Sequence, residues 1–283
     1  MFEITKEIIL ANLSKVLDPD LGKDLVSLGM IKDVVINGKN IALTVELTTP
    51  ACPLKAEIEK SVREALSYIP EIGDIKVNIT GKTRGAIFKQ EAIYGVKNVI
   101  AVASGKGGVG KSTVSVNIAV ALSQSGARVG ILDADIYGPT IPQMMGVYSL
   151  NPPVNKKIEP AENYNVKIMS IGFLIKESDA VIWRGPMIAG VVQQFLREVN
   201  WGELDYLIVD LPPGTGDAQL TLAQNIPVTG AVIVMTPQKI AVSIASKAIT
   251  MFNKLNVPIL GIIENMSFFI CNHCHEKRNK VFS

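Results

Sequence analysis

The 283-residue chain has few cysteines, little net charge and no long apolar run. Its three cysteines are an odd number, which excludes a disulfide framework of the kind found in small secreted proteins. The formal net charge of +2 gives no reason to expect nucleic acid as a partner. No apolar run approaches the ~18 residues of a membrane span, and the first residues lack the apolar core of a signal peptide. We therefore expect a cytoplasmic protein that binds neither nucleic acid nor membranes.

The hydrophobic pattern changes near residue 98, which predicts two domains. Residues 1–80 combine two stretches of helical spacing with three short strands, as is typical of a small α+β domain. The first helical stretch runs from Ile4 to Leu17, and a hairpin is expected around Asn37-Gly38. Residues 81–97 form the expected linker to a second domain, residues 98–283.

In the second domain, runs rich in Val and Ile alternate with stretches of helical spacing. Near-continuous apolar strands are typical of a parallel sheet that is buried on both faces. The sequence therefore predicts a doubly wound α/β domain with a mostly parallel sheet, whose ligands bind at the carboxyl ends of the strands. The expected strands are 99–103, 128–132, 166–170, 206–209, 231–235 and 259–263.

A glycine-rich segment follows the first of these strands and fits the phosphate-loop pattern G-x-x-x-x-G-K-[ST]. Glycines let backbone N–H groups approach a phosphate closely, and the helix that follows adds partial positive charge at its N-terminus. A flexible glycine turn, the plain alternative, accounts for neither the preceding strand nor the following helix. The nucleotide-binding residues that we predict here are Gly105, Lys106, Gly107, Gly108, Val109, Gly110, Lys111, Ser112 and Thr113.

Several side chains near the predicted loop have the chemistry of nucleotide hydrolysis. Lys111 is expected to contact the β- and γ-phosphates, and the Ser112 hydroxyl is expected to bind Mg²⁺. Asp210 ends an apolar strand in the Walker B pattern, whose carboxylate helps to hold Mg²⁺. Asp133 and Asp135 follow the second strand of the domain and are candidates to orient the attacking water. A capping or turn role is the alternative for each aspartate taken alone.

Lys106 and Asn265 are further candidates for nucleotide contacts. A phosphate loop does not require Lys106, which is either a solvated loop lysine or a second cation aimed at a nucleotide, including one held by another subunit. Asn265 follows the sixth strand of the domain, where it could read an adenine edge or simply form a turn.

Cys271 and Cys274 form a C-x-x-C pair, which fits a redox dithiol, half of a zinc site or half of an iron–sulfur site. Two thiolates are too few for a structural zinc or a [4Fe–4S] cluster, so a two-fold dimer is the simplest completion. Zinc bound with His273 or His275 is a rival, and two unligated cysteines are the plain alternative. Cys52, in the other domain, is either a reactive thiol before a helix or a buried structural cysteine.

Together these motifs resemble the Mrp/ApbC family of iron–sulfur cluster carrier ATPases, in the ParA/MinD-type branch of phosphate-loop proteins. Residues 1–80 are similar to the small domain of iron–sulfur assembly proteins. Family members usually continue well beyond the C-x-x-C pair, so we expect the second domain to be short at its C-terminus. The resemblance rests on the segments from Gly105 to Thr113, Leu132 to Pro139, Trp183 to Met187, Asp210 to Asp217 and Glu264 to Ser267, and on Cys271 with Cys274.

The resemblance implies a homodimer that hydrolyses ATP weakly and transfers iron–sulfur clusters to apoproteins. Its implied cofactors are ATP, Mg²⁺ and a [4Fe–4S] cluster shared by Cys271 and Cys274 of both subunits, and its partners are recipient apoproteins and assembly scaffolds. By the same resemblance, Lys106 reaches the nucleotide of the other subunit and Asn265 lies beside the adenine. The alternative function is a ParA/MinD-like positioning or regulatory switch, which needs neither the cysteine pair nor the small domain.

Overall fold

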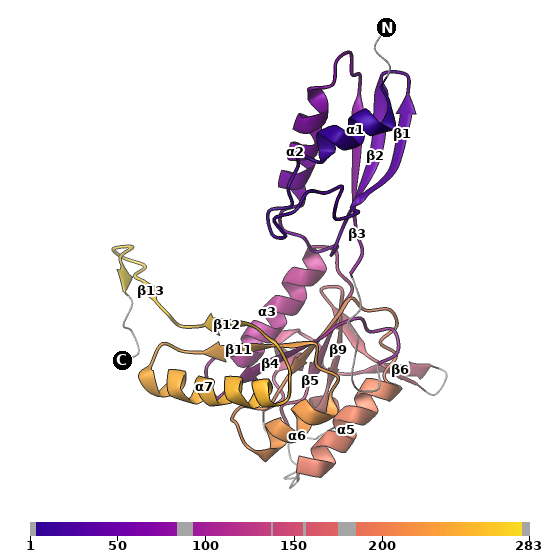
Figure 1. Cartoon of the computed structure of the whole chain (residues 1–283). Helices are drawn as coiled ribbons and strands as arrows, with labels where there is room; N and C mark the ends of the chain where they lie inside the picture. The colour runs from indigo at the N-terminus through magenta and orange to yellow at the C-terminus, as the bar shows by residue number, and fades with distance from the viewer. Residues whose placement is uncertain (1–3, 84–92, 137, 155–156, 175–184, 279–283) are drawn as a thin grey trace. The chain divides into compact units, whose positions relative to one another are not determined.

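The structure is a computed structural model (Figure 1) that describes residues 4–83, 93–136, 138–154, 157–174 and 185–278. Contacts between residues divide the chain into two compact units, Met1–Arg84 and Gly85–Ser283. Part of the predicted linker, residues 84–92, and the motif residues Tyr137, Trp183 and Arg184 fall outside the described ranges. No helix among the described residues is long and apolar enough to cross a membrane.

The smaller unit packs two helices against a three-stranded sheet of order β1-β2-β3. β1 and β2 form the antiparallel hairpin expected from the sequence, and Gly38 in its turn has a φ of 62°, which side chains rarely allow. β2 and β3 run parallel, and the helix between them buries Ile58, Val62 and Leu66 at helical spacing. The elements are α1 (Lys6–Leu13), β1 (Ile31–Asn37), β2 (Asn40–Leu47), α2 (Lys55–Ser67) and β3 (Ile75–Gly81).

The first helix is shorter than its hydrophobic pattern predicts. It ends at Leu13, whereas the apolar spacing continues to Leu17. The side chain of Asp18 accepts hydrogen bonds from the backbone N–H groups of Asp20 and Leu21, both at 2.9 Å, and thereby stabilises a turn. The helix ends early because the chain after Leu13 pairs with a later segment: the Leu25 N–H donates to the Val16 carbonyl at 3.0 Å, and the Asp18 N–H donates to the Lys23 carbonyl at 2.9 Å.

The larger unit is built on a seven-stranded sheet of order β12-β11-β4-β10-β5-β9-β8. All neighbouring strands are parallel except β8, which runs antiparallel to β9 at one edge. The sheet strands are β4 (Val99–Ser104), β5 (Val129–Asp133), β8 (Ala161–Asn163), β9 (Val166–Ser170), β10 (Tyr206–Asp210), β11 (Gly230–Met235) and β12 (Ile259–Glu264). The six parallel strands are those that the sequence predicts, with ends that differ by about one residue.

Helices cover both faces of this sheet, as Figure 1 shows. One face contributes to the main apolar core, in which Phe195, Leu222 and Phe252 of α5, α6 and α7 pack against the strands. α3 contacts β4, β5 and β10, and its buried Ser115 and Ala119 lie outside that core, on the other face. The helices are α3 (Lys111–Gln124), α4 (Ile141–Met144), α5 (Gly185–Glu198), α6 (Asp217–Asn225) and α7 (Lys239–Lys254), with a 3₁₀ turn at Ile171–Phe173.

Two short hairpins complete the larger unit, and the sequence pattern does not predict either of them. β6 (Asn151–Val154) pairs with β7 (Lys157–Glu159), and β13 (Phe269–Ile270) pairs with β14 (Lys277–Arg278). Strands of two to four residues are too short for an alternating pattern to stand out.

At the end of the sheet where the parallel strands begin, buried Asp205 connects the segments that precede β4, β5 and β10. It accepts hydrogen bonds from Lys97 Nζ at 2.7 Å and from the Arg128 backbone N–H at 3.0 Å. Burial acts to raise the pKa of Asp205, but hydrogen bonds from Lys97 and Arg128, together with the charge of Lys97, lower the pKa to about 2. The carboxylate is therefore stabilised in its charged form in the folded protein.

We expect Asp205→Asn to lower the free energy of unfolding of the larger unit by about 1–3 kcal/mol at pH 7, because charge-assisted hydrogen bonds are lost. The lowered pKa means that this stabilisation is complete above about pH 4 and is lost as the pH falls toward 2. Urea unfolding followed by tryptophan fluorescence should show the wild-type advantage shrink over that range. Exposed Glu203→Gln is the matched control, and an advantage that is independent of pH would contradict the assignment.

Candidate functional site

The order of the strands brings the predicted catalytic groups together at the carboxyl ends of the central strands. β10 lies between β4 and β5, and Asp210 pairs with Val102 on one side and with Asp133 on the other. Because the carboxyl ends of parallel strands lie on the same side of the sheet, the phosphate loop after β4 becomes a neighbour of Asp210 and Asp133. Residues separated by about a hundred positions in the sequence therefore form one site.

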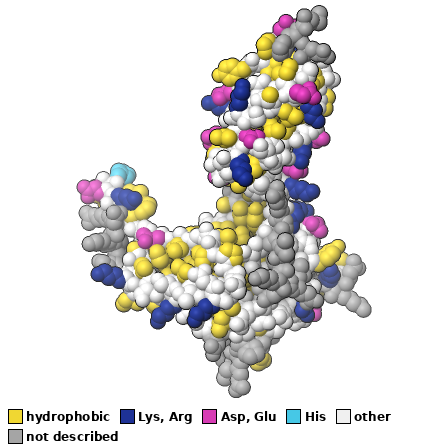
Figure 2. All heavy atoms as spheres, in the orientation of Figure 1, with side chains coloured by type: hydrophobic (Ala, Val, Ile, Leu, Met, Phe, Trp, Pro, Cys, Tyr) yellow, Lys and Arg dark blue, Asp and Glu magenta, His cyan; other side chains and the backbone are white. Residues whose placement is uncertain are grey.

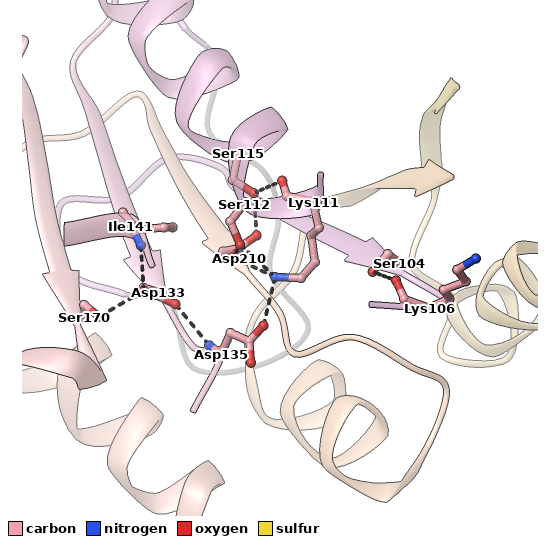
Figure 3. Close-up of polar contacts among 10 residues, drawn as sticks. All are labelled: Ser104, Lys106, Lys111, Ser112, Ser115, Asp133, Asp135, Ile141, Ser170 and Asp210. Atoms are coloured by element: carbon pink, nitrogen blue, oxygen red, sulfur yellow. Dashed lines mark hydrogen bonds and ion pairs between the residues drawn. The ribbon is translucent and has the colours of Figure 1, made fainter. Parts of the chain in front are cut away.

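The side chain of Asp210 is the centre of this site (Figure 3). It is 0% exposed, and its Oδ2 atom lies 2.7 Å from Lys111 Nζ and 2.6 Å from Ser112 Oγ. Its Oδ1 atom accepts a hydrogen bond from Ser115 Oγ at 2.6 Å. A buried carboxylate is costly unless it is paired and hydrogen-bonded, and these three donors from the start of α3 meet that requirement.

The two aspartates after β5 have different surroundings. Asp135 Oδ2 lies 3.4 Å from Lys111 Nζ, so it faces the lysine that is predicted to bind phosphate. Asp133 accepts hydrogen bonds from Ser170 Oγ at 3.0 Å and from the backbone N–H groups of Asp135 and Ile141 at 3.2 Å. Burial and the nearby charge of Asp210 raise the pKa of Asp133 to about 7, against the effect of these hydrogen bonds. Asp133 therefore organises the loop after β5, while Asp135 points into the site.

The glycine loop between β4 and α3 needs its glycines for two different reasons. Gly108 and Gly110 have φ values of 75° and 85°, which side chains rarely adopt. At Gly105, a Cβ atom would lie 2.6 Å from Ile244 Cγ2 of α7, so the loop can approach this helix only without a side chain. The sequence predicts glycine here for phosphate access, and the structure adds close packing against α7.

The remaining loop residues are more exposed. The Lys106 side chain is exposed and points away from Lys111 and the aspartates in Figure 3, while its carbonyl accepts a hydrogen bond from Ser104 Oγ at 3.0 Å. Gly107 and Thr113 are exposed, and Val109 is buried at 2% exposure. Lys106 thus does not join the cluster that its neighbour Lys111 forms.

Asn265 is joined directly to the phosphate loop. Its Nδ2 atom donates to the carbonyl oxygen of Val109 at 2.9 Å, and its Oδ1 atom accepts from the backbone N–H of Met266 at 2.9 Å. Asn265 therefore borders the predicted nucleotide site, and its role in adenine recognition stays a prediction.

Cys271 and Cys274 lie in the turn of the β13–β14 hairpin, away from the aspartates. The turn is closed by hydrogen bonds from the His275 N–H to the Cys271 carbonyl at 2.8 Å and from the Cys271 N–H to the Glu276 carbonyl at 3.1 Å. Backbone N–H groups of Cys274 and His273, and then the Cys274 side chain, lower the pKa of Cys271 by hydrogen bonding. The turn is thus shaped to stabilise a thiolate, the form that binds metals.

No third Cys, His, Asp or Glu joins the pair in a metal-holding group among the residues that the structure describes. His273 and His275 are exposed, and Cys52 is half-buried beside the core of the smaller unit.

Ser115 and Ser170 are absent from the predicted site, yet their hydroxyl groups donate hydrogen bonds to Asp210 and Asp133. Ser115 lies four residues after Lys111, on the same face of α3, and that spacing is the one signal that could have revealed it. Ser170 ends the neighbouring strand β9 in register with Asp133, which is visible only once the strand order is known.

Comparisons with known proteins identify the family. A family model described as the NUBPL iron-transfer P-loop NTPase matches residues 95–283, about two thirds of the chain. The chain belongs to this family. A second model, described as an iron-sulfur cluster assembly protein, matches residues 6–79. The resemblance drawn from the motifs is therefore confirmed.

Individual relatives agree with the family models. An iron-sulfur cluster carrier protein of Synechocystis sp. is 50% identical over 99% of this chain and 81% of the relative. One from Deinococcus radiodurans is 51% identical over 93% of this chain and 75% of the relative. A solved nucleotide-binding protein from Archaeoglobus fulgidus, in complex with ADP, is 45% identical, with a TM-score of 0.58 over 66% of this chain and 73% of its own. The likeness confirms the predicted α/β fold.

We expect Ser115→Ala to weaken nucleotide binding only when Mg²⁺ is present. The lost hydroxyl leaves Asp210 Oδ1 buried without its donor, so the carboxylate no longer holds its orientation toward Ser112. Nucleotide affinity measured with Mg²⁺ should fall by about tenfold, which corresponds to ~1.4 kcal/mol. Affinity in the presence of a chelator should stay unchanged.

The matched control for that experiment is Ser125→Ala, because Ser125 Oγ donates to the local carbonyl of Ala121 at the end of the same helix, far along it from Asp210. Equal losses of affinity with and without Mg²⁺ would contradict the positioning role of Ser115.

Proposed function

We propose that this protein carries iron–sulfur clusters to recipient apoproteins and couples carriage to ATP binding and hydrolysis between two copies of the chain. The observation that carries the proposal is the pairing of two sites in one iron-transfer NTPase unit. One is the Lys111–Asp210 phosphate site, and the other is a thiolate-stabilising turn at Cys271 and Cys274. A positioning switch without a cluster would have no use for the second site.

The nucleotide site fits ATP with Mg²⁺. Ser112 Oγ and Asp210 Oδ2 lie 2.6 Å apart beside the loop. Mg²⁺ prefers oxygen ligands of this kind, together with water and phosphate oxygens. The bound ion neutralises charge that develops on the phosphate oxygens. The backbone N–H groups from Gly105 to Lys111 bind the phosphates, and the N-terminus of α3 favours their negative charge.

Lys111 must exchange partners when a nucleotide binds. Its Nζ atom contacts Asp210, Asp135 and Ser112 at 2.7, 3.4 and 3.3 Å. An ammonium group has three donors, so contacts to phosphate oxygens replace some of these. Nucleotide binding is therefore linked to the position of Asp135, which is released from the lysine as the phosphates arrive.

Asp135 is the better candidate to orient the attacking water. It faces Lys111, whereas both oxygens of Asp133 already accept hydrogen bonds from Ile141, Ser170 and Asp135. A water-orienting group needs an oxygen directed at the γ-phosphate side of the site. We assign Asp133 to holding the loop in place.

Lys106 acts on the nucleotide of the partner copy in this proposal. Its side chain is exposed and directed away from the site of its own chain (Figure 3). If a second copy places its phosphate loop opposite, Lys106 lies beside the nucleotide of that copy. Its positive charge then stabilises the negative charge that develops on the phosphates in the transition state.

The cluster is cargo held between two copies. Each hairpin contributes Cys271 and Cys274, and two copies supply the four thiolates that a [4Fe–4S] cluster usually takes. Both cysteines lie on an exposed turn, so a recipient protein can reach the cluster for ligand exchange. The smaller unit, which matches iron-sulfur assembly proteins, is proposed to act as a separate domain in loading or delivery.

We expect the double substitution Cys271→Ser with Cys274→Ser to abolish cluster binding, because a hydroxyl does not replace a thiolate ligand. Anaerobic reconstitution of the wild type, followed by iron and sulfide counting and an absorption spectrum, should give about one [4Fe–4S] cluster per two chains. Cys52→Ser is the control and should keep the cluster. A full cluster on the double variant, or zinc alone on the wild type, would reject the assignment.

We expect Lys106→Ala to keep ATP binding but to lower ATP turnover by about 10³-fold, as for other cations supplied in trans. Steady-state phosphate release and a fluorescent-nucleotide titration separate the two effects. Lys254→Ala, which removes an exposed lysine at the end of α7, is the matched control. Unchanged turnover in Lys106→Ala would remove this residue from the mechanism.

A further inference from the structure

The carboxamide of Asn265 is a physical link between the phosphate loop and the segment that leads to the cysteine pair. Nδ2 donates to the Val109 carbonyl at 2.9 Å, and the Asn265 backbone N–H donates to the Met235 carbonyl at 2.8 Å. Oδ1 accepts from the Met266 N–H at 2.9 Å. The residue is therefore fixed to the loop, to the end of β11 and to its own turn.

The phosphate loop packs closely against the side chain of Asn265. A Cβ atom at Gly110 would collide with Asn265 Nδ2. The Val109 side chain is buried at 2% exposure, so the carbonyl that accepts the hydrogen bond is held by an anchored residue. A shift of the loop backbone cannot leave the position of Asn265 unchanged.

The turn that follows passes this position on toward the hairpin. Met266 has a φ of 56°, and Ser267 Oγ donates to the Glu264 carbonyl at 2.6 Å, which closes the turn directly behind Asn265. β13 starts at Phe269, and Cys271 follows six residues after Asn265. Loop and cysteine pair are thus joined by one short segment.

Among the residues that the structure describes, the hairpin is largely exposed, and Lys277 Nζ, 4.0 Å from the centre of the Phe268 ring, contacts a neighbour within the same segment. Phe268, Phe269 and Ile270 are 50%, 46% and 50% exposed, and β13 continues from β12 at the edge of the sheet (Figure 1). Figure 2 shows hydrophobic and charged side chains uncovered on this part of the unit. The orientation of the hairpin therefore depends on the turn more than on buried contacts.

We infer that Asn265 is a positioning residue that couples occupancy of the phosphate loop to the orientation and thiol reactivity of Cys271 and Cys274. The inference rests on the proposed nucleotide binding. Phosphates that draw the loop amides toward themselves reorient the Val109 peptide, and the Asn265 carboxamide transmits that change to the turn. Coupling is reciprocal, so a ligand on the two thiolates changes nucleotide affinity by the same factor.

The test measures thiol reactivity, which requires no cluster. In a Cys52→Ser background, the reduced 283-residue chain reacts with 5,5′-dithiobis(2-nitrobenzoate) under anaerobic conditions, so Cys271 and Cys274 are the two reporters. Rates are compared without nucleotide and with Mg-ADP or Mg-ATP at a concentration that saturates each variant. We expect nucleotide to change the rate by about fivefold or more in the background protein.

Two substitutions separate the bonds of the carboxamide. Asn265→Ala removes the bonds of Nδ2 and Oδ1, while Asn265→Asp keeps an acceptor for Met266 and loses the donor to Val109. We expect the ratio of rates with and without nucleotide to fall to about one in both variants, because both lose the hydrogen bond to the Val109 carbonyl. Asn253→Ala, at an exposed position on α7, should keep the full ratio.

The outcomes are distinct from those that test the proposed function. A nucleotide-dependent ratio that survives in both Asn265 variants, with nucleotide bound and tryptophan fluorescence intact, overturns the coupling. An absent response in a background protein that binds nucleotide overturns it as well, while ATP binding and cluster carriage stand. Absence of nucleotide binding in the wild type would instead remove the proposed function, and the coupling with it.

Discussion

The buried carboxylate of Asp210 is the constraint on which the larger unit depends. A fully buried charge is tolerated only with donors around it, and within the described part of the chain Asp210 has three side-chain donors, from the first five residues of α3. The end of β10 and the start of α3 therefore have to meet. That meeting places the glycine loop, the N-terminus of α3 and the side-chain oxygens of Ser112 and Asp210 in one place.

The same requirement explains why Lys111 serves two purposes. Its ammonium group balances Asp210 and Asp135 in the fold and, in the proposed function, also binds the phosphates. Stability and nucleotide binding thus use the same charge, so binding rearranges contacts that hold the loops after β5 and β10. Ligand binding at such a site therefore changes the conformation of the neighbouring loops.

The turn that holds Cys271 and Cys274 is stabilised by local hydrogen bonds, unlike the buried phosphate site. It is exposed, its strands have two residues each, and the stability of its thiolate comes from local backbone N–H groups rather than from burial. Such a turn can open to a recipient protein, which a buried site cannot do. Its connection to the phosphate loop through Asn265 gives the two sites a shared mechanical element.

Much of the fold followed from the sequence, because apolar runs and helical spacing are local signals. The hairpin at Gly38, the six parallel strands, the glycine loop and the aspartate at the end of β10 were all visible in this way. The end of α1 was not, because the backbone of Val16 and Asp18 pairs with that of Leu25 and Lys23, which the hydrophobic pattern does not show. The short hairpins were not visible either, because two to four residues carry no measurable period.

The sequence alone determined the chemical groups available and the order in which they follow the strands. Only the tertiary structure decided which groups meet. It set Asp133 apart from Asp135, brought Ser115 and Ser170 to the carboxylates, and fixed Asn265 to Val109. The physical reason is that strand order in a parallel sheet is decided by packing across the whole unit, and neither spacing nor composition encodes it locally.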